Sequence, residues 1–239
     1  MILPLIYPRR CPFCQRVLPY SSYLCHTCMQ QLPLIHSPTC FRCGKPINQD
    51  RQELCYDCRI FPKSFEEGLA LFLYNDMTKR ATTAFKYHNQ RYLADFFTHA
   101  ILRMHLQKIS SWKLQAIIPI PIHKNKRKKR GYNQAELLAK QLSDYLRIPC
   151  YPHYILRTID TLPQKQFSPQ ARLNNLQKAF QVNPHYVNLE RTPESVLLID
   201  DIYTTGATME SCTRLLHAAG VKKVYIYSLC IGMARDEII

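Results

Sequence analysis

The sequence lacks a long hydrophobic run. Its longest apolar stretches cover residues 69–74 and 116–122, and both are far shorter than the roughly 20 residues that a membrane-spanning helix needs. The apolar run at the N-terminus is also brief, and its positive charges follow it at Arg9 and Arg10, unlike those of a secretory leader. We therefore expect no transmembrane segment and a cytoplasmic protein.

Acidic residues are scarce as well. The 239-residue chain has 17 Asp and Glu against 32 Lys and Arg, which gives a formal net charge of +15. The excess is concentrated in residues 121–180, which hold 12 basic and 3 acidic residues. This balance favours a polyanionic partner or a phosphorylated ligand. A hydrophobic content of 46% excludes wholesale disorder, because the chain can bury a core.

Cysteine, in contrast, is abundant near the start of the chain. Eight of the eleven cysteines form four C-x2-C pairs, separated by ten or eleven residues. The pairs are Cys11 and Cys14, Cys25 and Cys28, Cys40 and Cys43, and Cys55 and Cys58. Two such pairs can direct four thiolates at one tetrahedral zinc ion and leave no open position for chemistry. We therefore predict two structural zinc ions in a double zinc-ribbon module over residues 1–61.

Spacing alone leaves other uses of these cysteines open. The alternatives are a single zinc ion, an iron cluster, or a disulfide framework, which would require an oxidising compartment. Sequential pairing of the motifs suits two small ribbons, whereas interleaved pairing would give a cross-brace. A segment of about sixty residues with little apolar content needs its metal to fold. We expect the module to serve as a scaffold or a contact surface.

From residue 62 onward, apolar strands alternate with amphipathic helices. The spacing of apolar residues predicts helices over the ranges 77–88, 90–108, 133–146, 168–180 and 207–219. A strand or hairpin is predicted at 65–75, and further strands at 114–120, 154–157, 196–200 and 223–230. This alternation is typical of an α/β fold with a parallel sheet that carries helices on both faces. We predict one domain over residues 62–239.

The strand predicted at 196–200 leads into the sequence VLLIDDIYTTGAT, residues 196–208. Asp200 and Asp201 come at the edge where open α/β sheets bind their ligands. The small residues that follow let backbone N–H groups and a helix N-terminus converge on a phosphate. The combination suits a ligand that has a phosphate and vicinal hydroxyls.

This motif has two other interpretations. An apolar strand that ends in Asp-Asp also resembles the Walker B element of a nucleoside triphosphatase. That element needs a GxxxxGK-S/T loop elsewhere, and the chain, with only six glycines, has none. The remaining alternative is an acidic loop that only caps the following helix.

These residues resemble a known family. VLLIDDIYTTGAT is similar to the phosphoribosyl diphosphate (PRPP) signature of type I phosphoribosyltransferases, and the whole chain resembles the ComF/GntX family of competence proteins, which add an N-terminal zinc ribbon to that fold. RGYNQ from Arg130, FKYHN around Lys86 and the segment 157–180 match further motifs of that family. The chain departs from the pattern at Asn89 and Lys178, where glycine is usual, which affects the local shape of the loops.

The resemblance implies roles for particular residues. Asp200 and Asp201 would hold the ribose 2′ and 3′ hydroxyls of PRPP, directly or around Mg²⁺. The pyrophosphate would meet the loop that contains His123 and Lys124, with Arg130 nearby. The 5′-phosphate would lie in the loop formed by Thr204, Thr205, Gly206, Ala207 and Thr208.

The run KNKRKKR, residues 124–130, has six cations in seven residues. We interpret it as a basic loop beside the phosphate site that contacts a polyphosphate or a nucleic-acid backbone. Flanking tyrosines can stack on unpaired bases; the alternatives are a solvated loop and tyrosines that belong to the core. The candidate nucleic-acid contacts are Lys126, Arg127, Lys128, Lys129, Tyr132, Arg157 and Arg172.

Two functions follow from the resemblance. The first is a competence factor that receives incoming single-stranded DNA at the cytoplasmic face during natural transformation, beside DNA-uptake and recombination proteins at the inner membrane, with a PRPP-binding pocket. The second is an active phosphoribosyltransferase that uses PRPP and an unknown acceptor. The basic segment favours the first function, and the intact Asp-Asp and TTGAT elements keep the second open.

Overall fold

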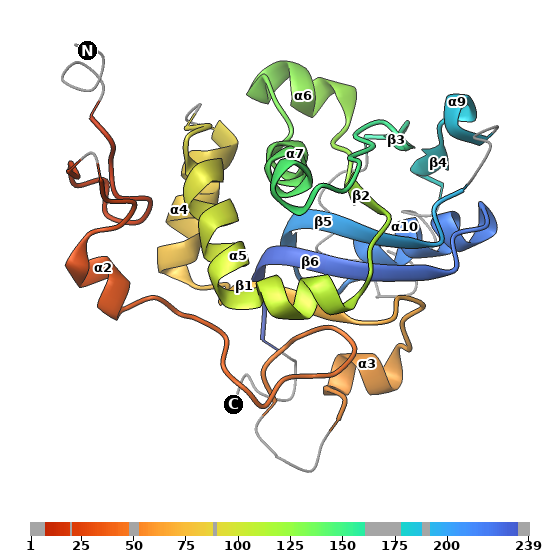
Figure 1. Ribbon diagram of the computed structural model, residues 1–239, viewed down its shortest axis with the longest axis horizontal. Coiled ribbons are helices and arrows are strands. Elements are labelled where there is room, and N and C mark those ends of the chain that lie inside the picture. The colour runs from red at the N-terminus through yellow and green to blue at the C-terminus, as the bar shows by residue number, and fades with distance from the viewer. Residues whose placement is uncertain are drawn as a thin grey trace.

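A four-stranded sheet forms the centre of the protein (Figure 1). The computed structural model describes residues 8–19, 21–47, 53–87, 90–160, 178–187 and 192–233. The order of the strands is β1 (Gly68–Leu73), β6 (Lys223–Ile231), β5 (Ser195–Tyr203) and β2 (Ala116–Pro119). Each neighbouring pair is parallel, so the predicted α/β fold is confirmed and the carboxyl ends of the strands share one edge.

Helices cover both faces of this sheet (Figure 1). One face carries α4 (Asp76–Tyr87), α5 (Leu93–Ser111) and α7 (Gln134–Leu146), and the other carries α10 (Ala207–Ala218). Neighbouring side chains of a strand point to opposite faces: Leu197 lies in the core beneath α5 and α7, and Leu198 lies in the core beneath α10. Burial on both sides explains why β5 is a continuous apolar run.

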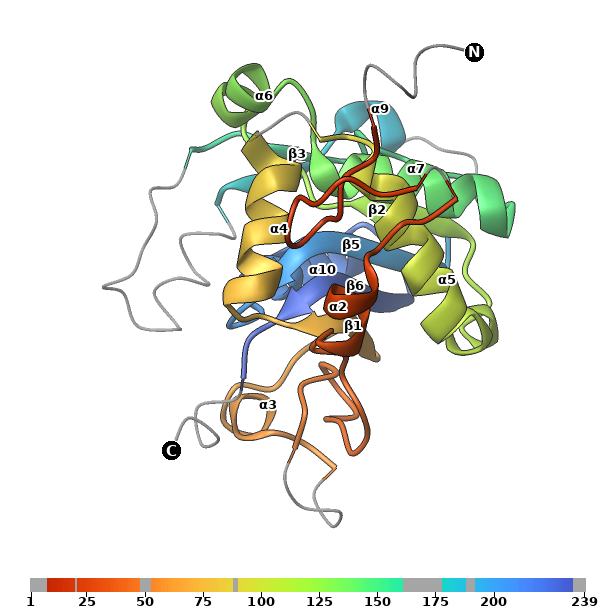
Figure 2. The same cartoon turned by 90° about the vertical axis from the view of Figure 1, so that its left-hand side faces the viewer.

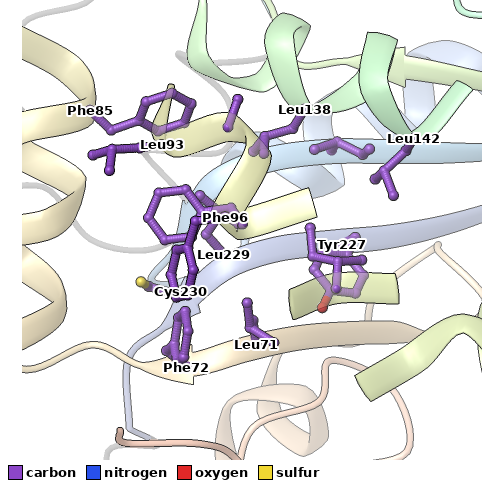
Figure 3. Close-up of a cluster of buried hydrophobic side chains, with 14 of the residues drawn as sticks. Leu71, Phe72, Phe85, Leu93, Phe96, Leu138, Leu142, Tyr227, Leu229 and Cys230 are labelled. Atoms are coloured by element: carbon purple, nitrogen blue, oxygen red, sulfur yellow. The ribbon is translucent and has the colours of Figure 1, made fainter. Parts of the chain in front are cut away.

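The core beneath α4, α5 and α7 is rich in aromatic side chains (Figure 3). The ring centroids of Phe72 and Phe97 are 6.5 Å apart, and those of Phe85 and Phe97 are 5.4 Å apart. The hydroxyl of Tyr227 lies 2.8 Å from Nδ1 of His105, so this buried polar group has a partner. The packing joins α4 and α5 to the sheet.

Local signals fix the ends of the helices. Oδ1 of Asn133 accepts a hydrogen bond from the N–H of Ala135 at 3.2 Å and caps α7. Gly220 follows α10 with a φ of +94°, a conformation that favours glycine. The helices predicted at 77–88, 90–108, 133–146 and 207–219 are confirmed, with small shifts at their ends. Across the described ranges, no helix combines the length and the hydropathy needed to cross a membrane.

The basic run at 124–130 differs from the prediction of a loop. It forms helix α6 (Lys124–Arg130). The side chain of His123 accepts from the N–H of Asn125 at the start, and Gly131, with a φ of +79°, ends the helix. Lys and Arg are good helix formers, and the two caps stabilise the helix despite repulsion among its cations.

A second, small sheet was not predicted. β3 (Ile155–Arg157) and β4 (Phe180–Val182) pair antiparallel, and the short helix α9 (Pro184–Val187) follows them. The strand predicted at 154–157 is confirmed. Phe180, predicted to end a helix, belongs to β4, and residues 168–177 of that predicted helix lie outside the described residues.

The cysteine-rich module packs into both cores of the protein. The segment with α2 (His26–Gln30) lies beside α4 and α5, whereas the segment with α3 (Tyr56–Ile60) lies near β1 (Figure 2). Cysteines of the first segment belong to the core beneath α4 and α5, and those of the second belong to the core beneath α10. The module therefore packs against both faces of the sheet. The domain boundary at residue 61 stays a prediction.

Candidate functional site

The candidate ligand site lies at the carboxyl edge of the sheet, where β5 ends. β5 runs through Asp200 and Asp201 to Tyr203, so it extends beyond the predicted strand. Because neighbouring residues of a strand face opposite sides, the two carboxylates point to different faces of the sheet. The N–H of Asp201 donates to Oδ1 of Asp200 at 2.8 Å. The two carboxylates therefore have different surroundings.

Asp201 faces α4 and pairs with Lys86. Nζ of Lys86 lies 2.8 Å from Oδ2 of Asp201, and both side chains are largely buried. Burial acts to lower the pKa of Lys86, but the charge and the hydrogen bond of Asp201, together with the charge of Asp200, outweigh it, so the pKa is raised and the ammonium group stays charged. The FKYHN motif contains Lys86, yet nothing in the sequence pairs it with Asp201, which is why it was not predicted as a site residue.

Asp200 faces α10 and the small sheet. Burial, together with the charge of Asp201, raises the pKa of Asp200 to about 7, although Lys86 and Arg157 act in the opposite direction. Burial likewise lowers the pKa of Arg157, an effect that the charge of Asp200 partly offsets. A cation bound beside a buried carboxyl of this kind would stabilise its ionised form.

Loop 204–208 connects β5 to α10 beside these carboxylates. Gly206 immediately precedes α10 and has a φ of +75°. A Cβ at this position would collide with the ring of Tyr203. The turn therefore requires glycine for two reasons, the positive φ and the lack of space for a side chain. Thr204 is exposed, and Thr205 and Thr208 are partly exposed. The loop thus presents hydroxyls and the first N–H groups of a three-turn helix, an arrangement that suits an anion.

His123 and Lys124 occupy the start of α6. His123 is buried, and its Nδ1 lies 3.2 Å from a carboxylate oxygen of Asp160. Nζ of Lys126 lies 3.7 Å from the other oxygen of Asp160. His123 therefore has a capping role in the structure, and contact of His123 or Lys124 with pyrophosphate stays a prediction.

Arg130 ends α6 and rests on Tyr87. Its guanidinium carbon is 4.8 Å from the centroid of the Tyr87 ring, and NH2 donates to the Tyr87 hydroxyl at 3.0 Å. NH1 donates to Oε1 of Gln134 at 3.2 Å. Tyr87 is 53% exposed and adjoins Lys86 in α4. The C-terminal end of the basic helix thus reaches the residue next to the lysine that holds Asp201.

The other predicted nucleic-acid contacts differ in accessibility. Tyr132 is buried, donates its hydroxyl to the carbonyl of Phe85, and has the guanidinium of Arg91 4.8 Å from its ring centroid. This environment gives a base no open ring face to stack on. The Arg157 guanidinium lies 5.3 Å from the centroid of Phe180. Arg172 lies outside the described residues.

Apart from Arg130, the cations of α6 fall into two sets. Lys126 is near Asp160, and NH1 of Arg127 lies 2.8 Å from Oε2 of Glu136. Lys124, Lys128 and Lys129 are exposed, and none of the three forms an ion pair within the described part of the chain. This second set is the part of the helix that is available to a polyanion.

Two groups of cysteines fit structural zinc. The first thiolate group is Cys11, Cys14, Cys25 and Cys28, and the second thiolate group is Cys40, Cys43, Cys55 and Cys58. Within each group all ligand atoms lie within 4.8 Å of one another. Of the two pairing schemes that the spacing leaves open, the structure therefore has the sequential one.

The distances between sulfurs match a zinc tetrahedron. The sulfurs of Cys14 and Cys25 are 3.6 Å apart, and those of Cys43 and Cys55 are 3.7 Å apart. A tetrahedron with Zn–S bonds of about 2.3 Å spaces its sulfurs by about 3.8 Å. A hydrogen bond with Cys43 lowers the pKa of Cys40, while the same bond raises that of Cys43. Four thiolates at this spacing need a cation, and all eleven cysteines are free of disulfides.

Comparisons with known proteins agree with both parts of this structure. Residues 2–59 match the model of the double zinc ribbon domain, and residues 132–237 match that of the phosphoribosyl transferase domain. Together with the geometry of the two thiolate groups, the first match supports two structural zinc ions.

Relatives match nearly the whole chain. Competence protein F of Haemophilus influenzae is 31% identical over 229 residues, which cover 92% of this chain and 96% of the relative. Competence protein ComFC of Bacillus subtilis is 28% identical over 203 residues, covering 82% of this chain and 79% of the relative. The DNA utilization protein YhgH of Salmonella typhimurium is 25% identical over 224 residues, covering 87% and 96%. By its fold, its thiolate groups and this full-length similarity, the chain belongs to the ComF family of competence proteins.

Proposed function

We propose that this protein handles incoming single-stranded DNA during natural transformation and binds PRPP with Mg²⁺ at the carboxyl edge of its sheet. The proposal extends to this chain what the names of its relatives state, competence and DNA utilization. The protein would act in the cytoplasm, beside DNA-uptake and recombination proteins at the inner membrane.

The observation that carries the proposal is the continuity between the basic helix and the candidate pocket. α6 presents three exposed lysines and ends at Arg130, which contacts Tyr87. The next residue back in α4, Lys86, holds Asp201. A strand of DNA along α6 and a diphosphate at the pocket would therefore meet through one short chain of contacts.

In this proposal each part of the pocket has a distinct task. Loop 204–208 holds the 5′-phosphate with N–H groups and threonine hydroxyls. Asp200 and Asp201 hold the ribose hydroxyls, and Mg²⁺ at these carboxylates would neutralise charge on the diphosphate. The bound ligand would compete with Lys86 for Asp201 and leave the ammonium group to the pyrophosphate. PRPP would in this way alter the charge next to Tyr87 and Arg130.

Fluorescence anisotropy of a labelled oligonucleotide tests the proposal. The zinc-loaded protein is titrated into single-stranded and duplex DNA at about 50 and about 200 mM salt, with and without PRPP and Mg²⁺. We expect tighter binding of the single strand, steep loss of affinity with salt, and a change of affinity on addition of PRPP. The double variant Asp200→Asn with Asp201→Asn is the matched control and should lose only the PRPP effect. Absence of DNA binding at the lower salt would reject the DNA-handling role.

A second candidate function is phosphoribosyl transfer to an acceptor. It is favoured by the complete series of Asp200, Asp201 and loop 204–208 at one strand end. In such a reaction the residues position PRPP and stabilise charge on the leaving pyrophosphate, and no nucleophilic side chain is needed. Release of pyrophosphate in a screen of acceptors, lost in the same double variant, would support this function over simple binding.

A further inference from the structure

The second thiolate group lies in the same buried core as the turn before α10. Its four cysteines, Tyr203 and Met209 belong to the core beneath α10. The first thiolate group belongs to the core on the other face. Two sets of contacts connect the second group to loop 204–208.

The first set of contacts passes through Lys45. This lysine lies two residues after Cys43 in the turn, and its carbonyl accepts a hydrogen bond from the N–H of Cys40 at 2.7 Å. Its side chain is only 2% exposed. Nζ donates to Oδ2 of Asp57 at 2.6 Å and to the carbonyl of Met233 at 3.2 Å. The turn around the second zinc centre thus fixes a buried ammonium group.

That ammonium group faces Tyr203, and Tyr203 supports the loop. Nζ of Lys45 lies 5.9 Å from the centroid of the Tyr203 ring. The ring is buried and lies against Gly206 so closely that a Cβ there would collide with it. The N–H of Gly232 donates to the Tyr203 carbonyl at 2.9 Å. The position of this ring therefore sets the position of Gly206, the residue that begins the turn into α10.

The second set of contacts passes through the segment that leaves the module. NH1 of Arg42, between two of the cysteines, donates to the carbonyls of Phe65 and Glu66. The N–H and Oγ of Ser64 each donate to the carboxylate of Glu210 at 2.8 Å. Glu210 lies in the first turn of α10 and is 1% exposed, and its N–H donates to the carbonyl of Gly206 at 2.8 Å. Both sets of contacts end at Gly206.

We propose that the second zinc centre is a positioning element of the ligand site, which holds loop 204–208 in its phosphate-binding conformation through Lys45 and Tyr203. Lys45 is buried and bonded to Asp57 and Met233, so it is a positioning residue that acts through the tyrosine ring. The inference rests on the proposed function for the identity of the ligand, PRPP, but not for the placement of the loop. The first zinc centre has no equivalent role, because it packs on the other face.

The variant Lys45→Met tests this directly, because it keeps the length of the side chain and removes its charge. Three quantities are measured on the zinc-loaded full chain: zinc content by elemental analysis, amide hydrogen exchange of residues 203–209, and PRPP affinity by calorimetry. We expect two zinc ions per chain, exchange about tenfold faster at 203–209, and PRPP affinity about tenfold weaker. Lys45→Arg keeps the positive charge, so its exchange rate at 203–209 and its PRPP affinity should both lie close to those of the parent.

Two further variants make the result decisive. Tyr203→Leu removes the ring and leaves the cysteine module unaltered, so it replaces Lys45→Met if that variant loses zinc. Arg80→Met is the control beside the first thiolate group, since Arg80 lines a cavity with Cys14 and Cys25; it should leave exchange at 203–209 unchanged.

The possible outcomes separate this inference from the proposed function. Unchanged exchange at 203–209 in both Lys45→Met and Tyr203→Leu would overturn the inference. An equal acceleration in Arg80→Met would also overturn it, because the effect would then be general loosening. If the parent protein does not bind PRPP, the proposed ligand is wrong, and the exchange data still decide whether the second centre positions the loop.

Discussion

The two thiolate groups share one ligand spacing but have different surroundings. In the first group Cys14 is exposed, and a cavity of about 230 Å³ borders the group. In the second group every cysteine is at most 3% exposed. The first group lies at the margin of the core beneath α4 and α5, with Cys14 open to solvent, whereas the second lies wholly inside the core that supports the candidate ligand site. Identical metal-binding motifs can thus contribute differently to the stability of the protein.

The largest expected effect comes from breaking the two groups one at a time. Cys43→Ser should destabilise the protein by about 4 kcal/mol or more, because the loss of the zinc leaves buried thiols in a core. Cys14→Ser, at the exposed position, should cost about half as much. Urea unfolding and zinc content per chain measure both changes, with the parent at two zinc ions. Equal losses of stability would contradict the difference between the groups.

The acidic pair extends the comparison to the two faces of the sheet. Asp200→Asn with Asp201→Asn should weaken PRPP binding at least about 100-fold while the fold persists, because these side chains lie at the end of a strand. Of the single variants, only Asp201→Asn should also destabilise the protein, by about 1–3 kcal/mol, since it leaves the charge of Lys86 buried. Calorimetry and thermal unfolding measure the two effects; unchanged PRPP affinity in the double variant would reject the pocket.

The basic helix allows a comparison between the two edges of the sheet. Replacement of Lys124, Lys128 and Lys129 by Ala should reduce the slope of log affinity against log salt for single-stranded DNA by about 2. The control removes the same charge at the opposite edge, with Lys113, Lys222 and Lys223 replaced by Ala. Anisotropy titrations measure both slopes. If the two triple variants behave alike, α6 is not the DNA-binding surface.

The smallest expected effect is a pH dependence at Asp200. Its pKa is raised to about 7 in the folded protein, above the unfolded value of about 3.9. Protonated Asp200 therefore stabilises the folded protein fully below about pH 4, and this stabilisation is lost as the pH rises through 7. Relative to the parent, Asp200→Asn should gain on the order of 1 kcal/mol of stability between pH 5 and pH 8. Urea unfolding at the two pH values measures the gain, and a loss over this interval would contradict the assigned environment.

The fold was predictable where local signals and burial agree. Apolar runs identified the buried strands, Asn133 and Gly220 marked helix ends, and the C-x2-C pairs identified the eight cysteine ligands but left their grouping open. α6 was predicted as a loop because its cations show no apolar periodicity; the caps at His123 and Gly131 were the signal that could have identified it as a helix.

The site was predictable only in part, because its key contacts are long-range. The motif at the end of β5 identified the candidate strand end, but not the continuation of the strand to Tyr203, which turns the two carboxylates to opposite faces. The pairing of Lys86 with Asp201 and the contact of Lys45 with Tyr203 join distant parts of the chain. No local pattern encodes such contacts, since they follow from the order of the strands.

The position of β1 has a consequence for synthesis on the ribosome. β1 is an edge strand whose partner is β6, and Gly68 pairs beside Ile226, more than 150 residues later. At typical elongation rates this interval lasts on the order of ten to thirty seconds. During that time both thiolate groups have emerged and can take up zinc, while the strand that anchors the second one does not yet exist. The nascent chain therefore carries a metal-loaded module before the strand that the module packs against has been made. A chain truncated before β6 would lack that strand permanently.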